Sequence, residues 1–148
     1  MKTQIDEYLV TTSEGMREVL SAARRVAIIG IKPESRAGAP AFYVPKYLQD
    51  VGYEVIPVPV YYPDVTTILG EPVYRRLTEI PGDIDLVVVF RRSEDVPKHV
   101  DEILEKKPGA VWLQLGIRND EAAARWAAAG IKVVQDRCSM VEHRNLVG

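Results

Sequence analysis

The stretch that decides the fold is Arg25-Val-Ala-Ile-Ile-Gly-Ile-Lys-Pro-Glu-Ser-Arg36. Its apolar run, residues 26–29, stops at Gly30, and a polar turn leads from there to a helical pattern near Pro40. A strand, a glycine, a polar turn and a helix, in that order, open a nucleotide-binding α/β unit. Gly30 permits a sharp turn, and the following helix can present free N–H groups to a phosphate. Any βαβ unit also needs a glycine at a strand end, so this stretch alone leaves both interpretations open.

Length and composition indicate one globular domain. The chain has 148 residues, 47% hydrophobic and 27% charged, which suits a single domain with a substantial core. The net charge of -2 argues against a general polyanion-binding surface, so no nucleic-acid partner is expected. The single cysteine, Cys138, excludes an intramolecular disulfide and a cysteine-cluster metal site.

The termini and apolar runs predict a protein without membrane association. Residues 1–8 lack the apolar core of a signal peptide. No apolar run approaches the roughly 20 residues that span a bilayer. We therefore expect a cytoplasmic location.

Apolar periodicity and turn residues divide the chain into alternating strands and helices. Residues 4–23 are helical in pattern, and Ser13 begins either a second capped helix or a continuation of the first. The predicted strands are residues 26–29, 53–58, 85–90, 110–115 and 131–135. The predicted helices are residues 40–51, 73–77, 93–107 and 119–129, followed by a loop or short last helix at 136–143.

Two of these helices carry signals about where they begin. Pro40 or Ala41 can start the first, although Pro45 would fit better if that helix began near Val44. Ser93 is a candidate N-cap for the helix at residues 93–107, and Asn119 for the helix that follows.

This order of elements predicts the fold class. Strands that alternate with helices imply parallel strands joined by right-handed crossovers. We expect an α/β protein with a three-layer α/β/α Rossmann-like fold, a five-stranded parallel sheet and an extra N-terminal helix at about residues 4–23. Without a repeat, a low-complexity tract or a linker, residues 1–148 form one domain.

Ligands of such sheets bind at the carboxyl ends of the strands. The five turns expected there span residues 30–36, 57–62, 90–92, 114–118 and 136–138. Five cations lie in or near them: Lys32, Arg36, Arg91, Arg92 and Arg118. In a slightly acidic chain this clustering favours a phosphate-bearing ligand, although loop arginines also commonly face water.

The second turn argues against a dinucleotide. NAD-binding units place an acidic residue near the end of their second strand, where this chain has Pro57-Val-Pro59. The first turn also lacks the three-glycine spacing, since the next glycine after Gly30 is Gly38. An apolar wall fixed by prolines would instead fit the face of an adenine.

Seven stretches, in order, carry a family resemblance. They are Val26-Ala-Ile-Ile-Gly-Ile-Lys-Pro-Glu-Ser-Arg36, Tyr43-Val-Pro-Lys-Tyr-Leu48, Gly52-Tyr-Glu-Val-Ile-Pro-Val58, Leu69-Gly-Glu-Pro-Val73, Asp85-Leu-Val-Val-Val-Phe-Arg91, Val111-Trp-Leu-Gln-Leu-Gly-Ile117 and Asp136-Arg-Cys-Ser-Met-Val-Glu-His143. With them the chain resembles the stand-alone CoA-binding proteins, whose Rossmann-type domain is similar to the CoA-binding domain of the succinyl-CoA synthetase α subunit. The chain departs from that pattern in the four residues 37–40 before the first helix, and in lacking the common Asn-Pro pair at the second turn.

The resemblance implies coenzyme A or an acyl-CoA as ligand. It implies phosphates near residues 30–36, adenine or ribose near Pro57, Val58, Phe90 and Arg91, and the pantetheine arm past residues 114–116. The expected binding residues are Gly30, Ile31, Lys32, Pro33, Ser35, Arg36, Pro57, Val58, Phe90, Arg91, Arg92, Gln114, Gly116 and Cys138.

Three functional hypotheses stay open at this point. The leading one is a CoA-binding protein without catalysis of its own, with a homo-oligomer among the open assembly states. The second is an enzyme of acyl-CoA or thiol redox chemistry that uses Cys138 or His143. The third is an NAD(P)-type nucleotide-binding or protein-interaction module. His99 is expected to lie away from the ligand edge, and two histidines with one cysteine do not make a metal site.

Overall fold

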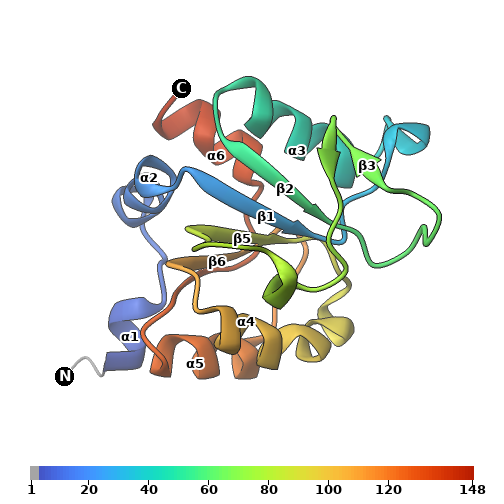
Figure 1. Ribbon diagram of the computed structural model, residues 1–148. Helices are drawn as coiled ribbons and strands as arrows, with labels where there is room; N and C mark the ends of the chain where they lie inside the picture. The colour runs from blue at the N-terminus through green and yellow to red at the C-terminus, as the bar shows by residue number, and fades with distance from the viewer. Residues whose placement is uncertain (1–3) are drawn as a thin grey trace.

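The computed structural model describes residues 4–148, so residues 1–3 of the expected domain lie outside it. Its main sheet has five parallel strands in the order β2-β1-β5-β6-β7 (Figure 1). Their bounds are β1 Arg25–Ile29, β2 Glu54–Val58, β5 Leu86–Val89, β6 Ala110–Leu113 and β7 Lys132–Val134. The predicted five-stranded parallel sheet is thereby confirmed.

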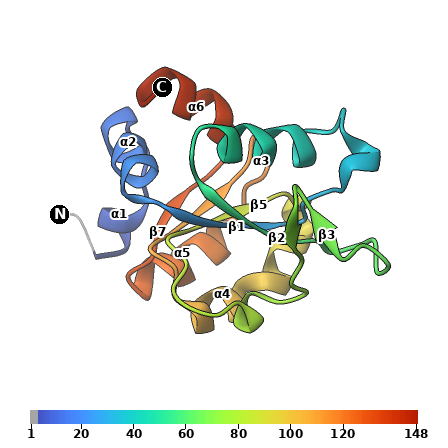
Figure 2. The same ribbon diagram turned by 45° about the horizontal axis from the view of Figure 1, so that its top comes forward.

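Helices cover both faces of the sheet. Figures 1 and 2 show α2, α3 and α6 on one side and α1, α4 and α5 on the other. Their bounds are α1 Gln4–Tyr8, α2 Ser13–Ala22, α3 Pro40–Asp50, α4 Val100–Lys106, α5 Asp120–Ala128 and α6 Ser139–Leu146. This is the expected three-layer α/β/α Rossmann-like arrangement.

The N-terminal segment forms two helices on opposite faces, so a single extra helix over residues 4–23 is wrong. Thr12 caps α2, because its hydroxyl accepts a 3.0 Å hydrogen bond from Gly15 N–H. Between the helices the chain passes the outer edge of β7, where Val10 N–H donates to Val133 C=O at 2.8 Å. That bond covers part of an exposed strand edge, and it explains why the helix is interrupted.

The core lies on both sides of the sheet because successive strand residues point to opposite faces. From β1, Ala27 and Ile29 pack with α4 and α5, while Val26 and Ile28 pack with α2 and α3. All four are fully buried, as are Val87 and Val88 in β5. Burial on both faces is why these strands read as continuous apolar runs.

Three predicted features of the connecting segments are wrong. Residues 73–77 are not a helix; a two-stranded hairpin, β3 Thr67–Ile68 and β4 Glu71–Pro72, precedes them, and the 3-10 helix η2 spans Leu77–Glu79. The segment after β5 begins as the 3-10 helix η3, Ser93–His99, which contains Pro97, and becomes α4 only at Val100. Ser93 caps no helix, because its hydroxyl accepts from Arg118 N–H at 3.0 Å instead.

Helix α3 begins at Pro40 and keeps Pro45 inside it. Proline has no N–H, so the carbonyl of Ala41, four residues earlier, loses its helical partner. Lys32 N–H takes that carbonyl at 3.1 Å. The irregularity that argued for a later start therefore anchors the turn after β1 to the first part of α3.

Gly30 joins the two central strands at their carboxyl ends. Its φ is +82°, and a Cβ added there would lie 2.1 Å from the carbonyl oxygen of Phe90. Phe90 N–H in turn donates to Ile29 C=O at 2.8 Å. Only glycine provides both the left-handed backbone and the room for this contact.

We predict that Gly30→Ala lowers the free energy of unfolding by about 2–4 kcal/mol, through left-handed strain and the clash with Phe90. Urea denaturation followed by circular dichroism measures the change. The matched control is Gly38→Ala, whose added Cβ meets nothing within 4 Å. It should stay within about 0.5 kcal/mol of the wild type. Equal stability of the two variants would contradict the role assigned to Gly30.

Candidate functional site

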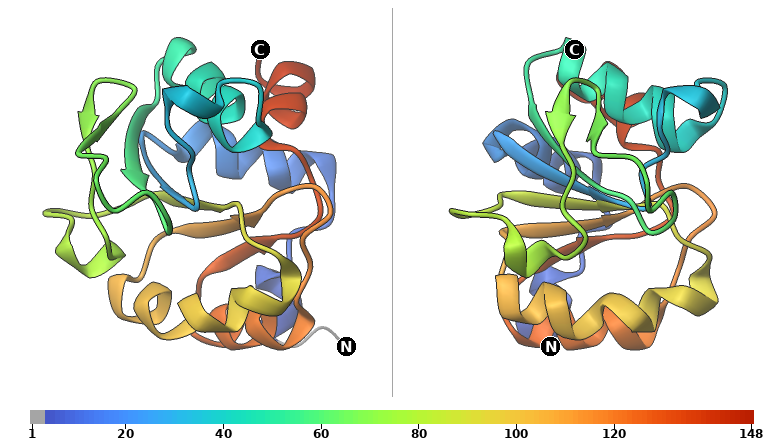
Figure 3. Two further views of the ribbon diagram at one scale, coloured as in Figure 1. Left: turned by 90° about the vertical axis from the view of Figure 1, so that its right-hand side faces the viewer. Right: turned by 45° about the vertical axis from the view of Figure 1, so that its right-hand side comes forward.

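The topological switch point lies between β1 and β5. From β1 the chain crosses through α3 to β2 on one side, and from β5 it crosses through α4 to β6 on the other. The turns after β1 and β5 therefore diverge and leave a crevice, the usual ligand position in an open α/β sheet. The left view in Figure 3 faces these carboxyl ends, where the loops gather.

The first turn, residues 30–36, is fixed by its apolar residues and by hydrogen bonds. Ile31 and Pro33 are buried. The Glu34 carboxylate accepts a 2.9 Å bond from Leu69 N–H, which ties the 3-10 helix η1, Glu34–Arg36, to the β3–β4 hairpin. Lys32 is half-buried, and Ser35 and Arg36 are exposed. This turn is ordered by its backbone and by Glu34, so its cationic side chains do not have to hold it.

Residues 37–40, which lengthen this turn, form a tight hydrogen-bonded turn. Ala39 N–H donates to Arg36 C=O at 2.9 Å, and Pro40 begins α3 directly afterwards. The extension is thus a compact turn between η1 and α3.

The second turn begins later than the sequence suggested. Pro57, which the sequence counted both in the strand 53–58 and in the turn 57–62, is buried within β2 and pairs with Ile28, while Val58 ends the strand. Because β2 is an edge strand, a residue without an N–H is tolerated there. Tyr61, which is 64% exposed, is the aromatic side chain that this turn presents to solvent.

Arg75 holds the second turn, a role that sequence reasoning missed. Its guanidinium donates to the carbonyls of Tyr61 at 3.2 Å, Tyr62 at 3.0 Å and Val65 at 2.8 Å. The signal in the sequence was weak, since a lone arginine after a loop usually faces water. With a further bond to the carbonyl of Pro63 at 3.4 Å, four bonds from one side chain order a loop that has no regular secondary structure.

The five predicted cations do not share one environment. Arg92 pairs with Asp95 at 3.2 Å, and Arg118 pairs with Asp120 at 3.1 Å. Within residues 4–148, Lys32, Arg36 and Arg91 have no ion pair with a carboxylate. All three belong to the turns that follow β1 and β5, the strands on either side of the switch point.

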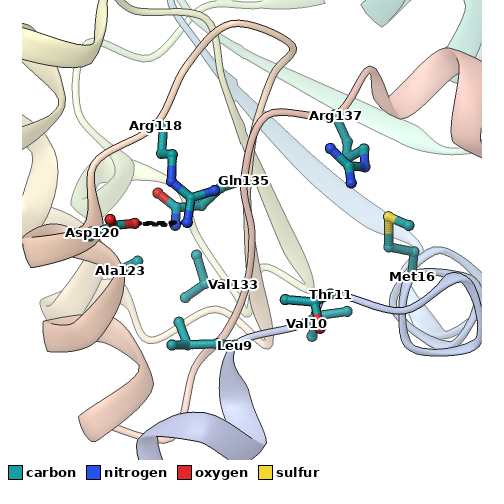
Figure 4. A pocket seen from close by; sticks show the side chains of 10 residues that line it. All are labelled: Leu9, Val10, Thr11, Met16, Arg118, Asp120, Ala123, Val133, Gln135 and Arg137. Carbon is teal, nitrogen blue, oxygen red and sulfur yellow. Dashed lines mark hydrogen bonds and ion pairs between the residues drawn. The ribbon is translucent and has the colours of Figure 1, made fainter.

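Arg118 faces a different pocket from the crevice. Figure 4 shows it with Arg137 over a pocket floored by Leu9, Val10 and Val133, at the outer edge of β7. The prediction that all five cations gather at the crevice is therefore wrong for Arg118. The N-terminal segment, which forms one wall of this pocket, was not placed there by the sequence.

The Asp95 carboxylate pairs with two cations, one of which is the predicted binding residue Arg92. Lys98 bonds to it at 3.0 Å on one side and Arg92 at 3.2 Å on the other. Lys98, and with it Arg92, holds the pKa of Asp95 below its ordinary value. Arg92 is exposed and is neutralised by this pair, so it differs from its neighbour Arg91.

The fourth and fifth turns are bonded to each other. Gly116 N–H donates to the Asp136 carboxylate at 2.7 Å, and Asp136 N–H donates to Ile117 C=O at 3.1 Å. The Gln114 side chain is buried, and its amide oxygen accepts from Ser139 N–H at 2.9 Å. Gln114 thus positions α6 and offers a ligand little more than its backbone.

Two further residues complete this end of the crevice. Leu115, which the sequence did not single out, is 69% exposed, whereas Gln114 before it is buried. Cys138 is half-buried at the N-cap of α6. The exposed Leu115 side chain gives the turn after β6 an apolar surface.

The two histidines occupy unexpected environments. His99, expected away from the ligand edge, accepts a 3.1 Å bond from Arg91 Nε–H and is therefore next to that edge. His143 is 6% exposed, and its Nδ1 lies 2.8 Å from the Tyr47 hydroxyl. Because α6 leads away from the edge, His143 packs between Tyr47 and Tyr53 instead of facing the crevice.

Neither a metal cluster nor a membrane helix is found in the described part of the chain. Residues 4–148 contain no group of three or more His, Cys, Asp or Glu side chains placed to hold a metal ion. None of their helices has the length and apolarity to cross a bilayer.

Comparisons with known proteins agree with this geometry. Residues 24–144 match the family model described as a CoA binding domain. The chain is 38% identical over 128 residues to the uncharacterized protein YneT of Bacillus subtilis (strain 168), which covers 86% of this chain and 91% of YneT.

Solved structures of other proteins share this fold. A protein of Thermus thermophilus superposes with a TM-score of 0.83 at 38% identity, covering 92% of this chain and 99% of that one. A hypothetical protein from Pyrococcus horikoshii OT3 superposes with a TM-score of 0.83 at 33% identity, covering 93% and 94%.

We predict that His143 makes stability depend on pH. Burial lowers the pKa of its imidazole below the ordinary 6.5, so the unfolded chain binds a proton more readily than the folded one. The contribution of His143 is complete above about pH 6.5 and is lost as the pH falls from there through the folded-state pKa. Urea denaturation of wild type and His143→Gln across this range measures it.

Carboxylates titrate in both proteins, so the difference between the two stability curves isolates His143. As the pH falls, the free energy of unfolding of the wild type should decrease relative to that of His143→Gln, by at most about 1.4 kcal/mol per pH unit. A difference that stays constant across the range would show that His143 gains its proton equally in both states.

Proposed function

The chain belongs to the CoA-binding domain family, and we propose that it binds coenzyme A or an acyl-CoA in the crevice at the carboxyl edge of the sheet, without catalysis of its own. The observation that carries this proposal is the set of three cations without carboxylate partners, Lys32, Arg36 and Arg91, around the switch point. Phosphates need such donors, and pairing with a protein carboxylate would compete for them.

The diphosphate would lie against the first turn. Gly30 lets the backbone approach closely, and Lys32, Ser35 and Arg36 supply an ammonium, a hydroxyl and a guanidinium. Ile31 and Pro33 are buried and fix the turn from below. The ligand would therefore meet donors that are already in place, which reduces the entropy cost of binding.

The adenine would lie between the second and third turns. Val58 and Phe90 border this part of the crevice, and the exposed ring of Tyr61 stands beside Arg91, whose guanidinium carbon is 5.8 Å from the ring centroid. An aromatic ring and a guanidinium both stack on a base face. Pro57, buried in β2, would support this wall from within the sheet.

The pantetheine arm would pass the fourth turn toward the fifth. Leu115 and Gly116 are exposed there, and Gly116 N–H bonds to Asp136 in the turn that leads to Cys138. An extended arm with two amides would find backbone groups and an apolar side chain along this path.

The alternatives have weaker support. An NAD-type ligand needs an acidic residue at the end of β2, where Pro57 and Val58 stand. Catalysis by His143 needs it at the crevice, yet its Nδ1 bonds with Tyr47. Cys138 lies at the crevice edge, but its Sγ has no hydrogen bond to a histidine, so nothing in residues 4–148 is arranged as its base.

We expect isothermal titration to give tighter binding of CoA or acetyl-CoA than of NAD or NADP. Lys32→Gln and Arg36→Gln should each weaken CoA binding by about tenfold, since each removes a charge-assisted bond worth about 1.5–3 kcal/mol in favourable geometry. The matched control is Arg125→Gln on α5, an exposed side chain paired with Asp101 at 3.6 Å. It should leave the affinity unchanged.

Three outcomes would reject the proposal in whole or in part. Tighter binding of NAD than of every CoA species would replace CoA as the ligand. Failure of all four nucleotides to bind or to raise the melting temperature would favour a protein-interaction module, because a ligand at 100 times its Kd adds about 2.7 kcal/mol. Turnover of acyl-CoA that is lost in Cys138→Ala would restore the enzyme hypothesis.

A further inference from the structure

A chain of three side chains leads from α4 to the crevice. The Glu102 carboxylate lies 3.1 Å from Nδ1 of His99, and Nε2 of His99 accepts from Arg91 Nε–H at 3.1 Å. The side chains of His99 and Glu102 are only 14% and 11% exposed. Arg91 directly follows Phe90, whose carbonyl meets Gly30, so the chain ends at the switch point.

The bonds of this chain determine the state of the His99 ring. A guanidinium only donates hydrogen bonds, so Nε2 facing Arg91 must carry a lone pair. A carboxylate only accepts, so the ring proton must be on Nδ1, where it donates to Glu102. His99 is therefore assigned as the neutral tautomer with its proton on Nδ1, which both neighbours require.

The same bonds determine where Arg91 points. Its Nε is held by His99, and its Nη1 donates to the Tyr61 hydroxyl at 3.4 Å. The guanidinium also lies over the Tyr61 ring. Within residues 4–148 no carboxylate forms an ion pair with Arg91: Glu102 is bonded to His99, and Asp95, which feels the charge of Arg91, is bonded to Lys98 and Arg92. The histidine thus stands between a cation and an anion that would otherwise neutralise each other.

We infer that His99 is a positioning residue for anion binding: with Glu102 behind it, it fixes the Arg91 guanidinium at the crevice while keeping its charge unpaired for the ligand phosphates. This inference rests on the proposed function. A neutral acceptor suits the task, since a carboxylate at that place would attract Arg91 and compete with a phosphate.

The first experiment compares His99→Leu with His99→Gln by isothermal titration of CoA. The glutamine amide oxygen can replace Nε2 as the acceptor for Arg91, whereas leucine cannot. We expect His99→Leu to weaken CoA binding about tenfold, a loss similar to that of Arg91→Gln, and His99→Gln to remain within about threefold of the wild type. In the Arg91→Gln background, His99→Leu should add no further loss, because both act on one contact.

Wild-type affinity in His99→Leu, or a full additional loss in the Arg91→Gln background, would overturn the inference. Circular dichroism establishes that each variant is folded. If His99→Leu does not fold, the ring tautomer of His99 in the wild-type protein, measured as described below, decides whether the imidazole accepts a hydrogen bond from Arg91.

The second experiment needs no ligand, so it separates this inference from the proposed function. Nitrogen-15 NMR of the histidine rings near neutral pH should report the Nδ1–H tautomer for His99. The Nε2–H tautomer, or an imidazolium, would overturn the geometry even if CoA binds. Absence of CoA binding by the wild type, together with the expected tautomer, would reject the proposed function and with it the role of His99 in anion binding.

Discussion

The close approach of Gly30 to the Phe90 carbonyl is the contact on which the rest of the crevice depends. It joins the carboxyl ends of β1 and β5, the strands between which the connections diverge. A side chain at residue 30 would push these ends apart, because its Cβ would overlap a backbone atom that cannot rotate away. Because Gly30 and Phe90 are held together, the backbone positions of the first turn and of Arg91, which directly follow them, are fixed relative to each other.

In the first turn, hydrogen bonds to backbone groups hold the loop, and the cationic side chains of that turn stay unpaired. Pro45 leaves the Ala41 carbonyl for Lys32 N–H, so the main chain of Lys32 is anchored while its ammonium is not. Glu34 accepts from a backbone N–H of the β3–β4 hairpin, although the cationic Arg36 is only two residues away. A phosphate site needs ordered donors with unpaired charge, and this division of roles provides both.

Side-chain pairing sorts the basic residues more sharply than their positions in the chain do. Arg91 and Arg92 are adjacent, yet the first bonds to a neutral imidazole and the second to Asp95. Successive residues after a strand point in different directions, so neighbours meet different partners. A charge count along the sequence therefore overstates the number of cations available to a ligand, and at this edge the three-dimensional pairing reduces five to three.

The sequence by itself determined the features that depend on neighbouring residues: the buried strands, the Asn119 cap of α5, the glycine after β1 and the order of the three layers. Apolar periodicity and capping act over a few residues, so they can be read directly. Only the tertiary structure placed Arg118 in another pocket and His99 against Arg91. Those outcomes depend on side-chain directions and on partners from separate elements, which are fixed only when the strands and helices pack.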